Sequence, residues 1–318
     1  AYTYMMTSAR PDNDQYNVSS LFGHVWLGDA SGHRLLFNAS HCRVALSSST
    51  LRAASAMGLA WIGEASGGNA SVHLSNATVD MGDVTLEPAS CFFQLAFRSP
   101  LSGVGVLLSL PRTAVSMRDS LVRATSSVFD VVWRGHSSGA GFGLVVDSSE
   151  VTAIASSLQY YSSVFSCRWK GANSGSNSSI SARSVGVRMV EGHVSEESAV
   201  WVQVWDGDAS GNHVHLDFTA AHVSLSFTSV EYSGLVAPSW KGVSSGSFFN
   251  FSMSRGVIAI SEGAYSLGGT SLQLLWFEDD SCVNAVLDFS HFSLTLDDTT
   301  LEDESSMFVL FVAGQKSG

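Results

Sequence analysis

Hydrophobic and polar residues alternate along most of this chain. Residues 214–218 (Val-His-Leu-Asp-Phe) and 223–227 (Val-Ser-Leu-Ser-Phe) carry an apolar side chain at every second position. Alternation with a period of two, in β-branched and aromatic residues, is typical of half-buried β-strands. No window of the sequence shows a convincing i, i+3, i+4, i+7 stripe of an amphipathic helix. The pattern therefore predicts an all-β protein.

The alternating segments recur with a period of about 36 residues. The motif Trp-x-Gly-x-x-Ser-Gly occurs six times, and three degenerate copies continue the series. The anchors that begin these copies are separated by 35 to 37 residues, and they are Trp26, Trp61, Phe97, Trp133, Trp169, Trp205, Trp240, Phe277 and Val312. Self-similarity at a fixed period is the sequence signature of a repeat architecture.

Three apolar columns repeat between the anchors. In the first unit they begin at Phe37, Val44 and Leu51, which lie eleven, eighteen and twenty-five residues past Trp26. The corresponding positions of later units carry almost only Val, Leu, Ile or Phe. Each unit therefore predicts three short strands, separated by corners rich in Ser, Gly and Asp.

Two architectures stack such units. In a β-helix each unit is one coil, and identical columns lie about 4.8 Å apart. A propeller blade needs four strands and usually about 40 to 50 residues. We therefore predict a parallel β-helix, right-handed as such crossovers usually are. It forms a single solenoid domain over residues 1–318, with about nine coils of about 36 residues and three strands per coil.

The two ends occupy nearly the same phase of the repeat, and neither shows an evident polar cap. Solenoids usually carry atypical capping repeats, because an open end exposes core and unpaired backbone. Two interpretations stay open. The chain is a section of a longer one, or copies dock head to tail as protomers of a fibre.

Composition narrows the possible classes of protein. The 318 residues are 45% hydrophobic and 14% charged, with 16 Lys and Arg against 28 Asp and Glu. High apolar content excludes a disordered chain, and sparse charge argues against a helix-rich enzyme. A net charge of −12 without a basic stripe gives no reason to expect nucleic acid as a partner. The apolar runs are too short for a membrane span in this segment.

Asn-X-Ser/Thr acceptors are more frequent than chance predicts from ten asparagines. They are Asn17, Asn38, Asn69, Asn76, Asn177 and Asn250. This excess predicts N-linked glycans on a secreted protein, located outside the cell or on its surface, with no other cofactor. The alternative is a by-product of serine richness.

Metal binding has weak candidates only. Asp206, Asp208 and Asp217 have the spacing of an EF-hand calcium loop. Other copies of this corner carry Leu, Ile, Arg or Lys where Asp206 stands, so the repeat explains most of the match and we expect no metal. His213 and His215 alternate and could bind zinc, but no third ligand is evident nearby.

Catalysis has little support in the sequence. Enzymatic β-helices need clustered carboxylates and a basic residue on one lateral face. The acids here lie at corners or late in the chain, in residues 279–280, 297–298 and 302–304, which predicts an acidic outer face and no catalytic residue. Cys42, Cys91, Cys167 and Cys282 share no column, so they are expected to be small buried thiols or one chance pair.

Units that close on an aromatic residue and a Gly-rich corner, as in residues 204–211 (Val-Trp-Asp-Gly-Asp-Ala-Ser-Gly), resemble a known family. The resemblance is to the dispersed gene family protein 1 group of kinetoplastid surface proteins. It spreads over the whole chain and is compositional. It implies a cell-surface or shed glycoprotein with a β-helical fold, an adhesive or coat role and no catalytic residues.

These observations predict a non-enzymatic extracellular glycoprotein, a rigid rod for coating or adhesion. Its expected partners are further copies of itself, head to tail, together with glycan or cell-surface ligands. The alternative is a carbohydrate-active enzyme or a carbohydrate-binding β-helix. That alternative requires a lateral groove lined by exposed aromatic residues and paired carboxylates.

Overall fold

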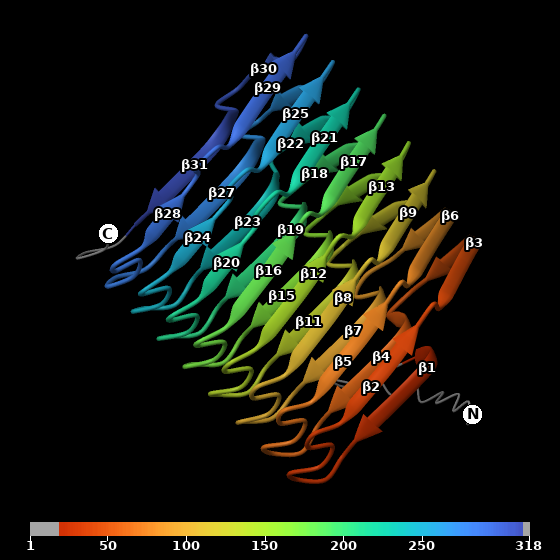
Figure 1. The fold of residues 1–318 in the computed structure, drawn as a ribbon, viewed down its shortest axis with the longest axis vertical. Coiled ribbons are helices and arrows are strands. Elements are labelled where there is room, and N and C mark those ends of the chain that lie inside the picture. The colour runs from red at the N-terminus through yellow and green to blue at the C-terminus, as the bar shows by residue number, and fades with distance from the viewer. Residues whose placement is uncertain (1–18, 314–318) are drawn as a thin grey trace.

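The computed structural model describes residues 19–313, and its regular structure consists of β-strands. Strands pair in parallel with strands about 36 residues away, so the chain winds into stacked coils (Figure 1). The predicted all-β parallel β-helix is confirmed, and residues 19–313 contain no helix. The described residues form about eight turns, where about nine coils were expected for the whole chain.

Three sheets, here called A, B and C, form the three sides of the solenoid. The nine strands of sheet A are β1 (Ser19–Trp26), β4 (Ala54–Trp61), β7 (Cys91–Phe97), β11 (Ser127–Trp133), β15 (Ser163–Trp169), β19 (Ala199–Trp205), β23 (Gly234–Trp240), β27 (Thr270–Trp276) and β31 (Ser306–Val312). The eight strands of sheet B are β2 (Leu36–Ser40), β5 (Ser71–Ser75), β8 (Leu107–Pro111), β12 (Gly143–Asp147), β16 (Ser179–Arg183), β20 (His215–Asp217), β24 (Asn250–Ser252) and β28 (Val286–Asp288).

Sheet C departs from one strand per coil. Its fourteen strands are β3 (Arg43–Leu51), β6 (Thr78–Leu86), β9 (Ala114–Arg118), β10 (Leu121–Arg123), β13 (Glu150–Ile154), β14 (Ser157–Gln159), β17 (Gly186–Val190), β18 (His193–Ser195), β21 (His222–Ser226), β22 (Ser229–Glu231), β25 (Val257–Ser261), β26 (Ala264–Ser266), β29 (Ser293–Asp297) and β30 (Thr300–Leu301). The first two coils place one long strand here, and later coils place two short ones.

A left-handed residue lies at one position of sheet C in every coil, including Ser48 (φ 44°) within β3 and Asp83 (φ 54°) within β6, which remain continuous. The break begins at β9, where a buried serine follows this residue. Asp119 has a left-handed backbone (φ 51°), and Ser120 follows it as a buried residue. The Ser120 hydroxyl donates to the carbonyl oxygen of Met81 in the coil below (3.2 Å). This hydrogen bond offers the backbone an alternative to the regular strand. The three predicted sides are thus present, and the third side divides from β9 onward.

The apolar columns predicted from the repeat line the interior. Leu144 of β12 pairs with Ile180 of β16, and Val151 of β13 pairs with Val187 of β17. All four side chains are buried. Because side chains of a strand alternate between its two faces, the residues between them point outward.

An aromatic ladder runs along the inner face of sheet A. Adjacent rings lie with their centroids 4.5–5.4 Å apart and their planes within 9° of parallel. Its members are Trp26, Trp61, Phe97, Trp133, Trp169, Trp205, Trp240 and Trp276. Stacked aromatic pairs contribute about 0.5–1.5 kcal/mol each beyond the burial of their surface.

One predicted anchor is wrong by one residue. Trp276, not Phe277, pairs with Trp240 and stacks on it, while Phe277 is 40% exposed. Consecutive residues of a strand point to opposite faces, so only one of the two aromatic side chains can enter the ladder. The strand register places Val312 opposite Trp276 at the end of this column.

The corner after the ladder requires glycine at two positions. Gly175 has φ 64°, and a Cβ there would lie 2.6 Å from Nε1 of Trp205. A Cβ on Gly171 would lie 2.1 Å from the carbonyl oxygen of Gly135 in the coil below. Left-handed backbone explains the first glycine, and close approach between coils explains the second.

Candidate functional site: a lateral groove on sheet A

The outer face of sheet A is hollowed into a groove of about 910 Å³. Its floor includes the half-buried side chains of Val202 and Val204 on β19 and of Ala237 on β23. One wall is the corner that leads from sheet C into sheet A, and the other is the corner that leaves sheet A. Small and apolar floor residues between bulkier walls produce the hollow.

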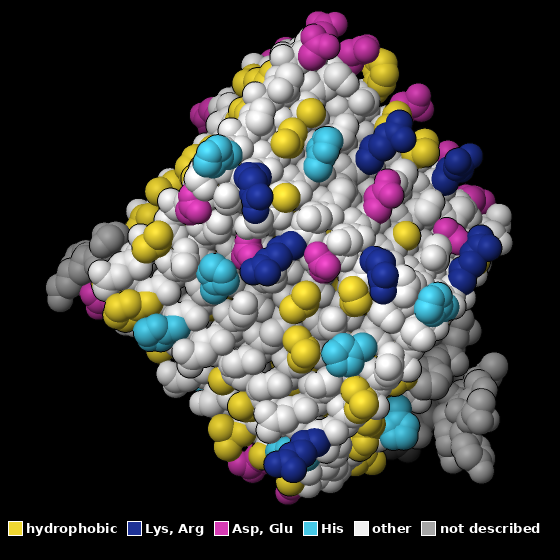
Figure 2. All heavy atoms as spheres, in the orientation of Figure 1, with side chains coloured by type: hydrophobic (Ala, Val, Ile, Leu, Met, Phe, Trp, Pro, Cys, Tyr) yellow, Lys and Arg dark blue, Asp and Glu magenta, His cyan; other side chains and the backbone are white. Residues whose placement is uncertain are grey.

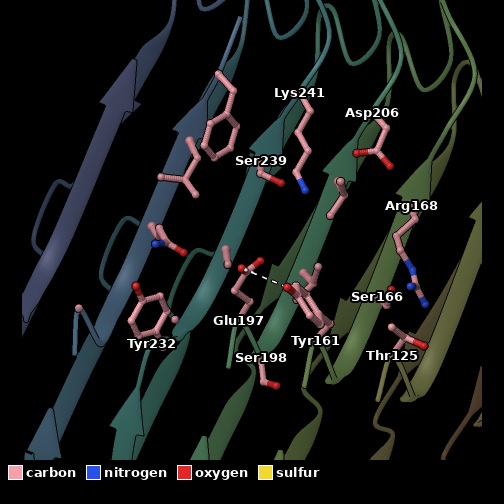
Figure 3. A pocket seen from close by; sticks show the side chains of 18 of the residues that line it. Thr125, Tyr161, Ser166, Arg168, Glu197, Ser198, Asp206, Tyr232, Ser239 and Lys241 are labelled. Atoms are coloured by element: carbon pink, nitrogen blue, oxygen red, sulfur yellow. Dashed lines mark hydrogen bonds between the residues drawn. The ribbon is translucent and has the colours of Figure 1, made fainter. Parts of the chain in front are cut away.

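The first wall carries Tyr161, Glu197 and Tyr232, which come from three successive coils (Figure 3). Tyr161 and Glu197 occupy the same position, and Tyr232 occupies the position of Glu196 in the next coil. The amide of Tyr161 donates to the carbonyl oxygen of Glu196 (2.9 Å), and the amide of Glu197 donates to that of Tyr232 (2.7 Å). All three wall residues have left-handed backbones, with φ of 61°, 57° and 51°. Bulky side chains are uncommon in that region, so this corner is strained.

The wall exposes two aromatic rings and one carboxylate. Tyr161 is 57% exposed and Tyr232 is 62% exposed. The Tyr161 hydroxyl donates to Oε1 of Glu197 (3.4 Å), and the nearby charge of Glu197 raises the pKa of Tyr161 (Figure 3). The phenol therefore stays protonated, and the pair presents one donor–acceptor unit to the groove.

The second wall carries charged residues that directly follow the aromatic ladder. Lys170, Asp206 and Lys241 occupy one position in successive coils. Their amides donate to the carbonyl oxygens of Trp133 (2.9 Å), Trp169 (2.8 Å) and Trp205 (2.8 Å), respectively. Figure 3 shows Asp206 and Lys241 across the strands from Tyr161, Glu197 and Tyr232.

The groove continues toward the N-terminal coils as a second hollow of about 230 Å³. Arg98 and Arg134 extend the column of Lys170, and Arg168 and Lys170 line both hollows. The acid among the residues lining this second hollow is Asp130.

Asp130 and Arg168 form a half-buried ion pair on the floor. Nη2 of Arg168 lies 2.8 Å from Oδ1 of Asp130, and Nε2 of Gln94 donates to Oδ2 of the same carboxylate (3.4 Å). The negative charge of Asp130 raises the pKa of Arg168, although burial opposes it. Arg168 therefore remains charged and is held against the sheet.

The four cysteines are free thiols. Cys91, Cys167 and Cys282 are buried, and Cys42 is half-buried. The expectation of small buried thiols is confirmed for the three buried ones, and the chance pair does not form. Burial raises the pKa of Cys91 and Cys167, with a further contribution from Asp130, so both thiols stay protonated.

The described acceptor asparagines gather away from the groove. Asn38 and Asn250 lie in sheet B strands, and the others occupy the corners on either side of that sheet. Asn76 is half-buried, and the four exposed acceptors are Asn38, Asn69, Asn177 and Asn250. Asn17 lies outside the described residues. Within residues 19–313, none of the acceptors lies on the outer face of sheet A.

The calcium candidates do not converge. Asp206 lines the groove, Oδ1 of Asp208 accepts from the amide of Val243 (3.1 Å), and Asp217 ends β20 beside Arg183. Across the described part of the chain, no three His, Cys, Asp or Glu side chains are grouped to hold a metal ion. His213 stacks on the ring of Phe248, with centroids 4.6 Å apart.

Charges on the outer surface are unevenly distributed. On the face drawn in Figure 2, basic and histidine side chains stand singly, and acidic side chains gather at the end formed by β29 and β30. Residues 278–304 contain nine Asp and Glu and neither Lys nor Arg. Asp303 and Glu304 reach the C-terminal end of the groove.

Sequence reasoning missed the groove, although its signals are readable. Twenty-eight residues past the anchor, the small residue Ala89 of an early unit gives way to Tyr161 and Glu197 in later ones. A basic residue directly follows the aromatic anchor in four units, as at Lys170 and Lys241. Both signals concern outward positions, which do not follow the apolar repeat.

Comparisons with family models, with curated proteins and with solved structures find no match for this chain. In residues 19–313 no helix has the length and apolar character needed to cross a bilayer.

Proposed function

We propose that this protein is a non-enzymatic extracellular rod for coating or adhesion, and that its groove binds a carbohydrate chain. The observation that carries the proposal is the division between two sides. The described acceptor asparagines lie on sheet B and its corners, whereas the groove with two exposed tyrosines lies on sheet A. Glycans on one side would leave the other open to a ligand. The resemblance to kinetoplastid surface proteins stays a prediction, and it agrees with this role.

A carbohydrate chain suits the chemistry of the groove. Sugar rings stack their apolar faces on aromatic side chains, and their hydroxyls take hydrogen bonds from groups at the edge. Tyr161 and Tyr232 are two coils apart, which is roughly 9.6 Å at the spacing of parallel strands. This distance is comparable to a disaccharide unit of an extended polysaccharide. Val202 and Ala237 add an apolar strip beside the rings.

The carboxylates of the groove favour binding over hydrolysis. Hydrolysis of a glycosidic bond requires two carboxyl groups that flank the same bond. Asp130 is engaged by Arg168 and Gln94, and Glu197 receives the Tyr161 hydroxyl. Asp206 stands on the opposite wall between two lysines. We therefore propose a binding module without catalytic residues.

Binding is tested on an array of neutral and charged polysaccharides. Tyr232→Ala is expected to reduce retention at least tenfold, because the exposed ring supplies the stacking surface. The matched control is Phe227→Ala, which removes an aromatic ring of similar exposure (55%) from another corner. Absence of any retained polysaccharide, or an equal loss in the control, would contradict the proposed groove function.

The glycan coat has its own measurement. The intact mass of protein secreted from a glycosylating host should fall after enzymatic removal of N-linked glycans. Replacement of Asn177 by Gln should reduce this loss of mass by the mass of one glycan, since Asn177 is exposed in the corner before β16. An unchanged mass would refute the coat.

A second candidate function, head-to-tail self-association, is favoured by a column of alternating charge on sheet C. Glu87 lies between Arg52 (2.6 Å) and Arg123 (2.5 Å). Glu302 occupies the position of Glu87 in the last coil. Leu86 and Leu301, the residues before them, pair with Leu51 and Tyr265 of the coils below. The amides of Glu87 and Glu302 donate to the carbonyl oxygens of the same two residues (2.8 Å for both). A second copy stacked in register would set its Arg52 over Glu302.

Net charge at the two ends supports the same arrangement. Residues 23–52 contain three Arg and one acid, Asp29, opposite in sign to the nine acids of residues 278–304. Light scattering should show mass rising with concentration, and Glu302→Lys should reduce this rise more than the control Asp297→Lys at the same end. Only monomers at the highest concentration would exclude the association.

A further inference from the structure

The groove is not uniform in charge along its length. Its N-terminal section carries a row of cations, here called the cationic row, that consists of Arg98, Arg134 and Lys170. These residues occupy one position in three successive coils, because their amides donate to the carbonyl oxygens of successive members of the aromatic ladder (3.0, 2.9 and 2.9 Å). Arg168 stands beside the row on the floor of the same section.

The cationic row is unusual in a protein of this composition. The chain has a net charge of −12 and only 16 Lys and Arg. Four of these line the second hollow together with a single acid, Asp130, which gives this section a net charge of +3. Asp130 is already paired with Arg168 (2.8 Å).

Stacking like charges in one column opposes folding. Neighbouring strands lie about 4.8 Å apart, and like charges directly opposite one another destabilise a sheet. The column of Glu87 shows the opposite arrangement, because there an acid separates Arg52 from Arg123. Arg134 and Lys170 are both exposed to the groove, where a bound anion can offset their repulsion.

We propose that the groove ligand is an acidic polysaccharide, whose carboxylate or sulfate groups bind the cationic row while sugar rings further along the same chain stack on Tyr161 and Tyr232. This inference rests on the proposed carbohydrate-binding function and adds the class of ligand. The row and the tyrosine wall stand at opposite ends of the seven-residue strands of sheet A, roughly 23 Å apart at the rise of a β-strand. A linear chain that crosses the groove obliquely can contact both. The Arg134 guanidinium matches an oxyanion in a bidentate manner, and Lys170 acts as a point charge.

The mixed charge of the remaining groove selects against a more densely charged polymer. Glu197, Asp206, Asp303 and Glu304 line the C-terminal section. A nucleic acid carries a phosphate on every residue and would be repelled there. A polysaccharide can present neutral rings to this section and anionic groups to the cationic row.

The test compares polymers that differ in charge but share a backbone. Dextran sulfate and neutral dextran are the matched pair, polygalacturonate supplies carboxylates, and a single-stranded oligothymidylate supplies phosphates. The protein is tested with the double variant Arg134→Ser/Lys170→Ser and with the control Arg188→Ser/Arg255→Ser. The control makes the same charge change outside the groove, on β17 of sheet C and in the corner before β25.

The wild-type protein should bind dextran sulfate or polygalacturonate at least tenfold more tightly than dextran. Affinity should fall with salt, and the groove variant should lose at least tenfold. The slope of log affinity against log salt should shrink by roughly 0.7–0.9 for each contact removed, by analogy with single- and double-stranded nucleic acids. The control should stay within about twofold of wild type. Whichever anionic polymer binds more tightly identifies sulfate or carboxylate as the recognised group.

Three results would overturn the inference. Equal binding of dextran and dextran sulfate, with loss in Tyr232→Ala alone, would remove the acidic class and leave the carbohydrate function intact. Oligothymidylate bound as tightly as dextran sulfate, or an equal loss in the control, would reduce the effect to general attraction of polyanions. Failure to bind any polysaccharide would refute the class of ligand and the groove function together.

Discussion

Sheets A and B belong to the same coils and face the same core, yet their outer sides differ. Sheet A carries strands of eight residues in β1 and β4 and of seven residues from β7 onward. Its outer side is a groove with charged walls and two tyrosines. Sheet B strands shorten from five residues to three at β20, and this side carries the described acceptor asparagines. Packing repeats on the inside, whereas the outside is free to specialise.

The strand alternation explains how one repeat permits two different sides. Inward positions must stack on the coil below, so Trp133 is followed by Trp169 in the same column. Outward positions need not match the coil below, and in a single column of sheet A the residues change from Gln94 to Asp130 to Ser166. Stability should therefore respond to the inner columns of both sheets, and ligand binding should respond only to the outer side of sheet A.

The largest effect is expected inside sheet A. Trp169→Ala should destabilise the protein by about 3–5 kcal/mol through the cavity, with a further contribution from two lost stacking contacts. Trp169→Phe should cost much less, because Phe97 occupies the same column and Nε1 of Trp169 is buried without a hydrogen-bond partner among the described residues. Ile180→Ala inside sheet B should cost about 2–5 kcal/mol.

Denaturant unfolding followed by circular dichroism measures these three variants. The ladder is the dominant element only if Trp169→Ala shifts the midpoint further than Ile180→Ala does. A smaller shift for Trp169→Ala would place the main packing energy in the aliphatic columns instead.

A smaller difference is expected between two glycines. Gly171→Ala, in the corner after sheet A, should cost about 1–3 kcal/mol or more, because its Cβ would lie 2.1 Å from a backbone oxygen that cannot move aside. Gly143→Ala at the start of β12 in sheet B should change stability by less than about 1 kcal/mol. Its Cβ would contact only the flexible end of Leu107 at 3.1 Å. Thermal unfolding of both variants checks the contrast, and equal losses would contradict it.

The sequence predicts the interior better than the exterior. The columns of Leu144 and Val151 follow from the 36-residue period, since core packing imposes the repeat. The error at Phe277 arose because two adjacent aromatic residues both fit the spacing, and only the strand register selects Trp276. The groove was not predicted, because it depends on Tyr161 and its neighbours in other coils. These residues occupy outward positions, where packing imposes no pattern.

A third contrast depends on pH and concerns sheet B. Asp217 is buried, which would raise its pKa, but hydrogen bonds from Thr219 and Arg183 (2.8 Å) outweigh burial and lower it. A carboxylate with a lowered pKa in the folded state stabilises the protein above its unfolded pKa. That stabilisation disappears as pH falls through the folded pKa. Unfolding free energy should therefore decrease below about pH 4.

Asp217→Asn should lose about 1 kcal/mol at neutral pH, since Arg183 is largely exposed and the pair is screened. It should also flatten the decrease at low pH. Urea titrations between pH 2 and 7 measure both effects. Asp147→Asn, an exposed carboxylate on the same sheet, is the control. A curve for Asp217→Asn that runs parallel to wild type would remove this ion pair from the acid response.

The smallest change in stability is expected at the groove wall, where it has the sign opposite to the others. Tyr161 holds a left-handed backbone (φ 61°), and Gly268 occupies the equivalent position of a later coil. A left-handed backbone costs a non-glycine residue about 1–2 kcal/mol of stability. Glycine avoids this strain but makes the unfolded chain more flexible, which lowers stability by about 0.4–1 kcal/mol. Tyr161→Gly should therefore stabilise the protein by up to about 1 kcal/mol while it weakens polysaccharide binding. The reverse change, Gly268→Tyr, should lower the unfolding temperature. A Tyr161→Gly variant that is less stable yet binds as wild type does would assign the tyrosine to the fold rather than to the ligand.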